Sequence, residues 1–253
     1  MPLLFTDPLD LWLMILGATL LVAAYGVYVN VVRVKSISEI SKSLGGGKQE
    51  AGEMLKQVLP ADVVLVNKGI GLYFISVGIY ALVTGLWGTY VWPLPGSYNI
   101  VLIDPWALFG VALLIIGVAL WSGLSPRYIA IPLAPLGIPV IVYSFVIWSM
   151  RLTRTPELSG LMYFLIGLSA LLSPLVLRES SYRKALGWLA TAFLVIAAAI
   201  ALYIGANAAF GHVAGWAVSV FIIICSAHVH WFLRPLNAMR YAESHEISKY
   251  ERQ

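Results

Sequence analysis

Residues 83–110 read VTGLWGTYVWPLPGSYNIVLIDPWALFG, in which a connection rich in proline and glycine separates two long apolar runs. Pro93, Pro95 and Gly96 favour a stiff, turn-rich connection. The run on each side is long enough to cross a bilayer as a helix, which takes about 20 residues. The stretch therefore predicts two membrane helices joined by an ordered loop over residues 92–104, on the outer side of the membrane.

The whole sequence shares this apolar character. Of its 253 residues, 60% are hydrophobic and 11% are charged, with a mean hydropathy of +0.87. Soluble domains are about 45–50% apolar and about 25% charged, so this composition indicates an integral membrane protein. We expect one all-α, polytopic membrane domain over residues 1–253 with seven transmembrane helices. The predicted spans are residues 9–33, 64–91, 104–122, 128–150, 158–178, 184–205 and 210–233.

Two of these spans have features that follow from proline. The third would begin at Asp104 and Pro105, an aspartate N-cap followed by proline at the first helical position. The fourth contains Pro132, Pro135 and Pro139, which predict a kink, because proline removes backbone hydrogen bonds from a helix.

The positions of the cations predict the orientation. With seven spans, every Lys and Arg except Arg151 and Arg154 falls on one side of the membrane. The positive-inside rule makes that side cytoplasmic, so the N-terminus lies outside and the C-terminus inside, in the cell (plasma) membrane. The cations would then meet anionic lipid headgroups, and nothing in their distribution indicates a nucleic-acid partner.

Residues 35–62, the only sizeable polar stretch, would form a cytoplasmic loop. They read KSISEISKSLGGGKQEAGEMLKQVLPAD, and the second half is typical of a short amphipathic helix on the membrane surface. The GGGK within it lacks the upstream glycine and the following Ser or Thr of a phosphate-binding loop. We interpret the glycines as a flexible linker.

The residues within the predicted spans argue against ion-coupled transporters, retinal proteins and metal-binding proteins. No Asp, Glu, Lys or Arg lies in the middle of a predicted span, unlike in many ion-coupled transporters. The seventh span has no lysine for a retinal Schiff base. His212 and His228 would lie about 24 Å apart along one helix, and His230 points to a different face from His228. We therefore expect no metal and no cofactor, with haem at a subunit interface as the weak exception.

The richest polar set is expected on the outer face. Arg151 and Arg154 break the pattern of the other cations and call for anionic partners, for which Asp104 and Glu157 are the obvious candidates. This set either staples the outer loops or forms a shallow polar pocket below the loop, together with Asp7 and Asp10. The candidate binding residues are Trp92, Tyr98, Asn99, Asp104, Arg151, Arg154, Glu157, Asn207 and His212.

The stretch 83–110 resembles an archaeal and bacterial family of membrane proteins described as a domain of unknown function, family nine-eight-one. The shared core is W-P-L-P-G-x-Y-N-I followed by an acidic residue and proline, and the similarity continues through residues 152–174 and 209–215. Family members often have histidine where this chain has Trp87, so no metal or proton role carries over to that position. The resemblance implies the fold and an important outer loop, and it brings no established activity.

Three classes of function remain. The first is a non-catalytic accessory or scaffold subunit of a larger membrane complex, such as a respiratory complex of an archaeon. Small residues within 17–26 and 190–201 favour it, because they suit helix packing with partners. The second is a carrier or binder of a small hydrophobic or lipid-like molecule, held by the outer polar set. An enzyme is least favoured, because no nucleophile–base spacing supports it. The expected partners are membrane lipids and either other membrane subunits or a second copy of this chain. The low content of Asn, Gln and Cys is typical of proteins from thermophiles.

Overall fold

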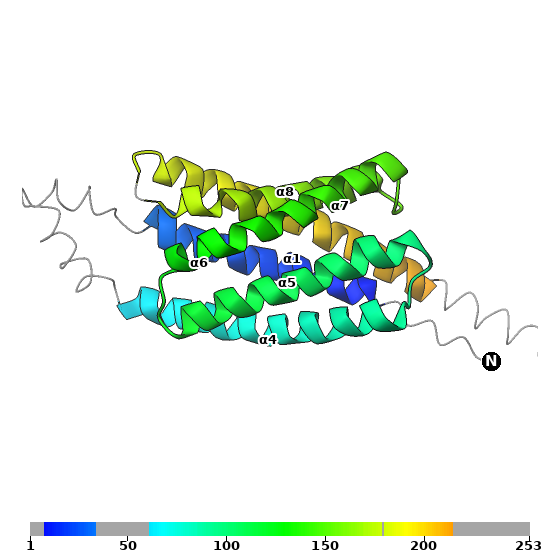
Figure 1. Cartoon of the computed structure of the whole chain (residues 1–253), viewed down its shortest axis with the longest axis horizontal. Coiled ribbons are helices and arrows are strands. Elements are labelled where there is room, and N and C mark those ends of the chain that lie inside the picture. The colour runs from blue at the N-terminus through cyan, green and yellow to red at the C-terminus, as the bar shows by residue number, and fades with distance from the viewer. Residues whose placement is uncertain (1–7, 34–60, 179, 215–253) are drawn as a thin grey trace, which may run out of the picture. The chain divides into compact units, whose positions relative to one another are not determined.

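The computed structural model describes residues 8–33, 61–178 and 180–214, and the secondary structure within these ranges is helical, without strands (Figure 1). Six helices there are long and apolar enough to cross a membrane, which indicates a membrane protein. The helices are α1 (Leu9–Val27), which continues into the π-helical turn η1 (Tyr28–Arg33), α4 (Ala61–Val91), α5 (Ser97–Trp121), α6 (Pro126–Leu133), the 3₁₀ turn η2 (Ala134–Leu136), α7 (Gly137–Met150), α8 (Pro156–Val176) and the helix Arg183–Ala214.

The chain divides into two compact units, residues 1–206 and residues 207–253. The first unit holds all of these helices up to residue 206. In the second, the described residues are 207–214, which are helical.

Helices α4 and α5 form an antiparallel hairpin whose backbones approach closely (Figure 1). A Cβ atom on Gly71 would lie 2.8 Å from the carbonyl oxygen of Gly117, and one on Gly110 would lie 2.5 Å from the amide nitrogen of Leu82. Glycine recurs at seven-residue spacing on both helices, and small residues at such positions let membrane helices pack backbone to backbone. The hairpin predicted from residues 83–110 is therefore confirmed.

Helices α7 and α8 form a second hairpin built in the same way. A Cβ atom on Gly167 of α8 would lie 2.8 Å from the carbonyl oxygen of Gly137 at the start of α7. The kink predicted in the fourth span is confirmed, since α6 ends at Leu133 and η2 separates it from α7. The prolines cause this break because they remove backbone donors.

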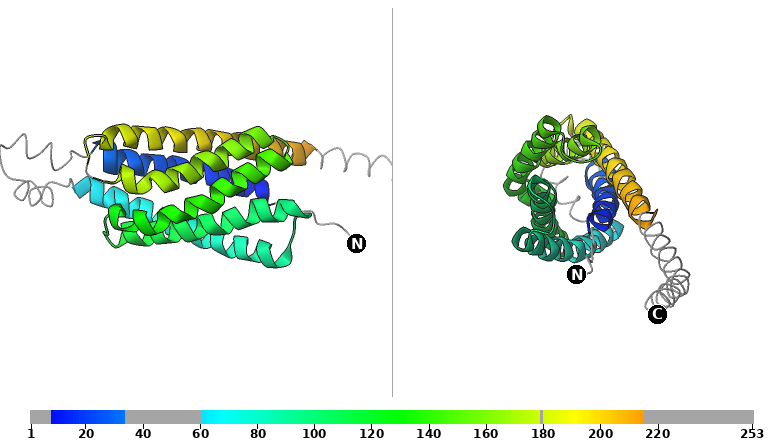
Figure 2. Two further views of the ribbon diagram at one scale, coloured as in Figure 1. Left: turned by 45° about the horizontal axis from the view of Figure 1, so that its top comes forward. Right: turned by 90° about the vertical axis from the view of Figure 1, so that its right-hand side faces the viewer.

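Within the first unit, helix α1 lies between α4 and residues 183–206 of the last described helix (Figure 2). Its small residues are used inside the chain: a Cβ atom on Gly17 would lie 3.0 Å from the carbonyl oxygen of Ala198. Ala197 and Ala201 are fully buried in the same core as Trp12 of α1. The small residues of these two spans therefore pack against one another.

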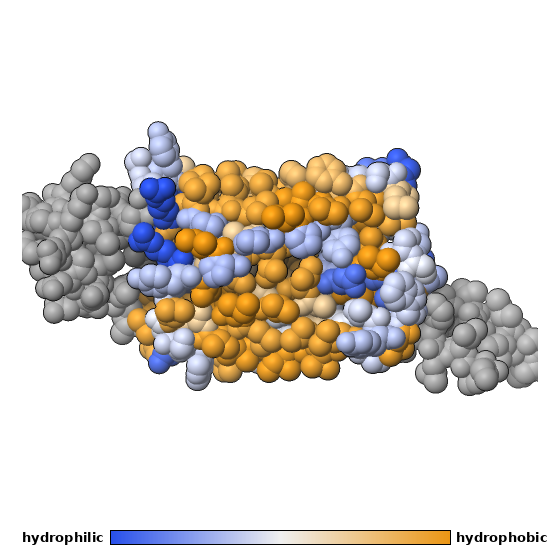
Figure 3. All heavy atoms as spheres, in the orientation of Figure 1, coloured by the Kyte–Doolittle hydropathy of each residue, from blue (hydrophilic) through white to orange (hydrophobic). Residues whose placement is uncertain are grey.

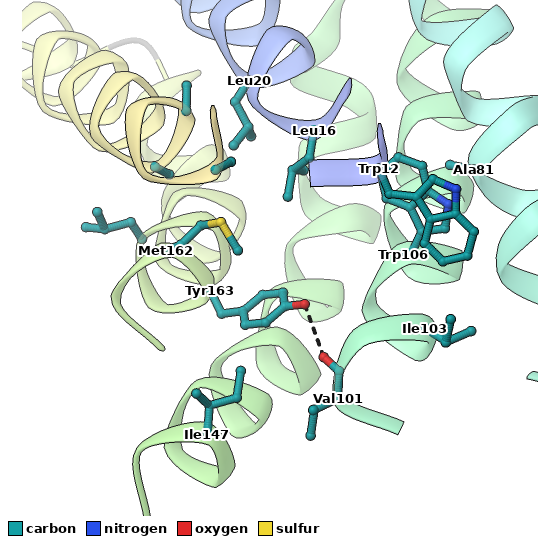
Figure 4. Packing of buried hydrophobic residues seen from close by; sticks show 14 of the residues in the cluster. Trp12, Leu16, Leu20, Ala81, Val101, Ile103, Trp106, Ile147, Met162 and Tyr163 are labelled. Atoms are coloured by element: carbon teal, nitrogen blue, oxygen red, sulfur yellow. Dashed lines mark hydrogen bonds between the residues drawn. The ribbon is translucent and has the colours of Figure 1, made fainter. Parts of the chain in front are cut away.

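The prediction that the third span begins at Asp104 is wrong, because α5 begins at Ser97 and contains Pro105 in its interior. A proline there leaves the carbonyl four residues earlier, that of Val101, without its helical donor. Tyr163 of α8 supplies the missing proton: its hydroxyl donates to that carbonyl over 3.1 Å (Figure 4). The helix can thus continue through the proline.

Two consequences follow for the predicted loop. The connection between α4 and α5 is confined to residues 92–96, so residues 97–104 are helical and not part of the loop as predicted. Asp104 lies about two turns, or about 10 Å, inside the span instead of at its start.

Four of the remaining predicted spans agree with the structure, whereas the break predicted between the sixth and seventh spans, over residues 206–209, is wrong because the helix Arg183–Ala214 continues through it. The first coincides with Leu9–Arg33, and the second, fourth and fifth begin within two residues of their predicted starts. The sixth was expected to end at residue 205, yet the helix continues to Ala214. Alanines at 206, 208 and 209 favour a continuous helix. Residues 215–233 of the predicted seventh span, and 35–60 of the predicted cytoplasmic loop, lie outside the described residues.

Candidate functional site

Asn99 orders the connection between α4 and α5. Its side chain is fully buried, its Nδ2 donates to the carbonyl oxygen of Gly88 over 3.2 Å, and its Oδ1 accepts from the amide of Leu94 over 3.2 Å. Trp92, at the end of α4, adopts a positive φ of 53°, a conformation that non-glycine residues rarely take. Asn99 therefore holds the loop in place and presents no exposed atom to a ligand.

Trp92 and Tyr98, the two aromatic candidates at this end of the hairpin, are exposed. Aromatic rings of this kind gather where a membrane meets water, since one edge is polar and the rest apolar. Their exposure fits a position at the membrane boundary.

The turn between α7 and α8 carries Arg151 and Glu157, whose side chains form an ion pair 2.8 Å apart. Glu157 was one of the two partners expected for the arginines. The pair is 73% and 68% exposed, so it contributes only about 0–1 kcal/mol to stability. Arg154 is also exposed and has no ion pair among the described residues. The predicted pairing of these arginines with Asp104 does not occur in the described parts of the chain.

Asp104 instead contacts hydroxyl groups from two other helices. The hydroxyl of Tyr143, on α7, donates to its Oδ2 over 3.3 Å, and Oγ1 of Thr89, on α4, lies 3.5 Å from its Oδ1. The carboxylate is half-buried and forms no ion pair with any described residue. One carboxylate thus brings together α4, α5 and α7.

This arrangement lies where the two hairpins meet. Figure 3 shows the face that carries α5 and α7, where hydrophilic side chains gather along the boundary between the hairpins and the surface is hollowed. The hydrogen bond between Tyr143 and Asp104 bridges that boundary.

Aromatic packing fixes the segment of α5 that carries the carboxylate. Trp106 stacks on Trp12 with ring centroids 5.4 Å apart (Figure 4). It donates its indole N–H to Thr84 Oγ1 over 2.9 Å. Trp12 in turn donates to the hydroxyl of Tyr80 over 3.2 Å. Each buried indole N–H therefore has a partner, and α5 is fastened to α1 and α4 beside the site.

A second polar cluster ties helices together at the opposite end of the same unit. The side-chain amides of Asn30 and Asn67 bond to each other in both directions, over 2.8 and 2.9 Å. The guanidinium of Arg183 donates to the backbone carbonyl of Asn30 over 2.6 Å, within the π-helical turn. The cluster joins α1, α4 and the helix Arg183–Ala214, and sequence analysis did not identify it.

Two further candidates, Asn207 and His212, belong to the second unit. Asn207 is exposed and His212 is half-buried on the last described turns of the chain. Across the described ranges, no group of three or more His, Cys, Asp or Glu side chains is placed to hold a metal ion. Asp7 lies outside the described residues.

Sequence analysis identified Asp104 and missed Tyr143 and Thr89, the residues that contact it. Both are single hydroxyl groups within apolar runs, and their approach to Asp104 depends on helix packing across 39 and 15 residues of sequence. The presence of an aspartate before a proline was the only local signal for the site.

Comparison with known families assigns the chain to one of them. The family described as "Protein of unknown function (DUF981)" matches residues 1–215, so the chain belongs to this family, as the resemblance at residues 83–110 implies. Neither a curated protein nor a solved structure matches the chain.

Proposed function

We propose that this family member binds an amphipathic small molecule within the membrane, with Asp104 at the polar end of the site. The observation that carries the proposal is a half-buried carboxylate about two turns inside α5 that contacts hydroxyls from two helices and no cation among the described residues. A charged group within the bilayer costs a few kcal/mol, and such groups are retained mainly where they serve a function. The apolar tail of the molecule would lie in lipid along α5 and α7.

The proposed topology predicts on which side of the membrane the site lies. With seven spans, an outer N-terminus and a cytoplasmic C-terminus in the cell membrane, residues 92–96 lie outside and Asp104 lies in the outer half of the bilayer. The distribution of Lys and Arg supports this orientation. A ligand would then enter laterally from the outer leaflet, as a carrier or binder requires.

The alternative is an accessory or scaffold subunit of a larger membrane complex, such as a respiratory complex. Small residues in the spans favoured it, because they suit packing with partner helices. Gly17, Ala197 and Ala198 are instead buried against other helices of this chain. The exposed apolar faces of the spans are consistent with this alternative. They do not distinguish it from the proposed function, because lipid covers such faces equally well.

Photolabelling tests the proposed site. The full chain in mild detergent is treated with a twelve-carbon alkyl probe that carries a photoreactive diazirine in its tail, and the labelled peptides are mapped. We expect labelling to concentrate on α5 and α7 and to fall at least about five-fold in Asp104→Asn. Glu157→Gln, which removes an exposed carboxylate at the same end, is the matched control and should label like the wild type.

Uniform labelling of all the spans, unchanged by Asp104→Asn, would contradict the proposal. The alternative is tested by purification from the source membrane: a stoichiometric complex with other membrane subunits, together with unlocalised labelling, would establish it instead.

A further inference from the structure

We propose that the polar head bound at Asp104 is a primary ammonium group. This inference rests on the proposed function and names the ligand chemistry of the same site. It follows from the directions of the hydroxyl protons at the site. If these protons are already donated elsewhere, the site can only accept hydrogen bonds from a ligand.

Each hydroxyl at the site has one proton, and both protons are already used. Thr89 Oγ1 donates to the backbone oxygen of Gly85 over 3.0 Å, which is shorter than its 3.5 Å separation from Asp104 Oδ1. The Tyr143 hydroxyl donates to Asp104 Oδ2. A hydroxyl has a single donor and two acceptor lone pairs, so Thr89 and Tyr143 keep only acceptor capacity.

The carboxylate of Asp104 also has only acceptor capacity. An ionised carboxylate has about four lone-pair directions, and the hydrogen bond from Tyr143 fills one of them. Side chains from three helices, α4, α5 and α7, therefore offer only acceptor oxygens around one negative charge. The complementary group is a cation with several N–H donors, and a primary ammonium has three.

Other head groups fit this set less well. A phosphate or carboxylate head would be repelled by Asp104 and would find no donor among these three side chains. An alcohol supplies one donor and no charge, whereas a trimethylammonium group supplies charge and no donor. A metal cation of the Ca²⁺ type takes about six to eight oxygen ligands, more than these three side chains supply.

Binding measurements with a matched probe series test the inference. The full chain in mild detergent is titrated by calorimetry with dodecylamine, dodecanol, dodecyltrimethylammonium and dodecanoate, all of which share one tail. We expect dodecylamine to bind at least about ten-fold more tightly than the other three, the minimum effect of a charge-assisted hydrogen bond. Asp104→Asn should weaken dodecylamine binding at least about ten-fold, and Thr89→Val should weaken it by a smaller factor.

Two controls make the result decisive. Glu157→Gln should bind dodecylamine like the wild type, which excludes attraction to any carboxylate at this end of the protein. Replacing NaCl by choline chloride at constant ionic strength should leave the affinity unchanged. Stronger dodecylamine binding when Na⁺ is removed would show that Na⁺ occupies the site, and would overturn the assignment to an ammonium group.

The source of the amine is distinguished with lipids. Native mass spectrometry in nanodiscs compares phosphatidylethanolamine, which has a primary ammonium, with phosphatidylcholine, which has none. Asp104-dependent retention of the ethanolamine lipid would identify a membrane lipid as the ligand, and its absence alongside dodecylamine binding would identify a free long-chain amine.

The failure of this inference differs from failure of the proposed function. Localised, Asp104-dependent photolabelling with equal affinity for all four heads would overturn the ammonium assignment and leave the site intact. Unlocalised labelling would overturn both.

Discussion

The hydrogen bond from Tyr163 to Val101 gives a sharp prediction, because it compensates for a specific missing donor. Pro105 has no N–H for the Val101 carbonyl, and the buried Tyr163 hydroxyl takes that place over 3.1 Å. Tyr163→Phe keeps the ring and removes this donor. A buried carbonyl left without a partner costs about 1–3 kcal/mol, and side-chain hydrogen bonds in membrane proteins contribute up to about 1.7 kcal/mol, so we expect a loss of about 1–2 kcal/mol.

The same substitution in a Pro105→Ala background separates this explanation from a general packing defect. The backbone N–H restored at position 105 can bond to Val101 within the helix, so Tyr163→Phe should then cost less than about 0.5 kcal/mol. Tyr90→Phe, at a tyrosine that is 85% exposed, is the control and should change nothing.

Reversible unfolding in mixed SDS and detergent micelles measures the free energies, and thermal scans should show a fall of about 2–4 °C per kcal/mol for a chain of this size. An equal loss in both backgrounds would refute the reasoning, since the tyrosine would then act independently of the proline. No loss in the wild-type background would refute it as well.

Three further predictions concern the scaffold around the site. Gly110→Ala should destabilise the α4–α5 hairpin by about 1–3 kcal/mol in the same unfolding assay, because the added Cβ would lie 2.5 Å from the α4 backbone. Gly69→Ala is the control: it has open space around it and should be neutral or slightly stabilising. Asn99→Ala should cost about 2 kcal/mol and make the 92–96 connection more sensitive to limited proteolysis, because two backbone groups lose their partner; unchanged cleavage would contradict its role. Arg151→Ala should change stability by less than about 1 kcal/mol, and a larger loss would show that its exposed ion pair with Glu157 matters more than its geometry indicates.

Hydropathy predicted that the chain consists of membrane helices, because a span needs only length and apolar composition. It also predicted a break over residues 206–209 that is absent, since the helix Arg183–Ala214 continues through these residues. The start of α5 was mispredicted for a definite reason. Locally, Asp104 and Pro105 have the pattern of a helix start, and the hydroxyl that lets the helix continue comes from Tyr163, far along the chain. No local pattern contains that information.

The small residues show a similar limit. Glycine and alanine in a membrane helix indicate close packing, but they do not indicate whether the neighbouring helix belongs to the same chain. Gly17 and Ala198 were interpreted as surfaces for partner subunits, and they pack against each other instead. Sequence analysis did not use the seven-residue spacing of Gly71, Gly78 and Gly85, which marks the face of α4 that packs against α5.

The candidate site was predicted in part. Polar residues near the ends of spans were grouped by topology, which correctly brought Glu157 together with the arginines, and it pairs with Arg151 at the surface. The same grouping placed Asp104 with these arginines, although its helix position turns it towards Thr89 and Tyr143. Pairing charges by sign found the exposed pair, and only the packed helices reveal the hydroxyl partners of the other carboxylate.

The measurement that tests the central claim most directly is mass spectrometry of the small molecules retained by the full chain after purification from its source membrane. The account predicts a stoichiometric amphiphile with a primary amine on the wild-type protein and on Glu157→Gln, and its loss from Asp104→Asn. The same retained molecules on wild type and Asp104→Asn would contradict the claim that Asp104 forms a binding site.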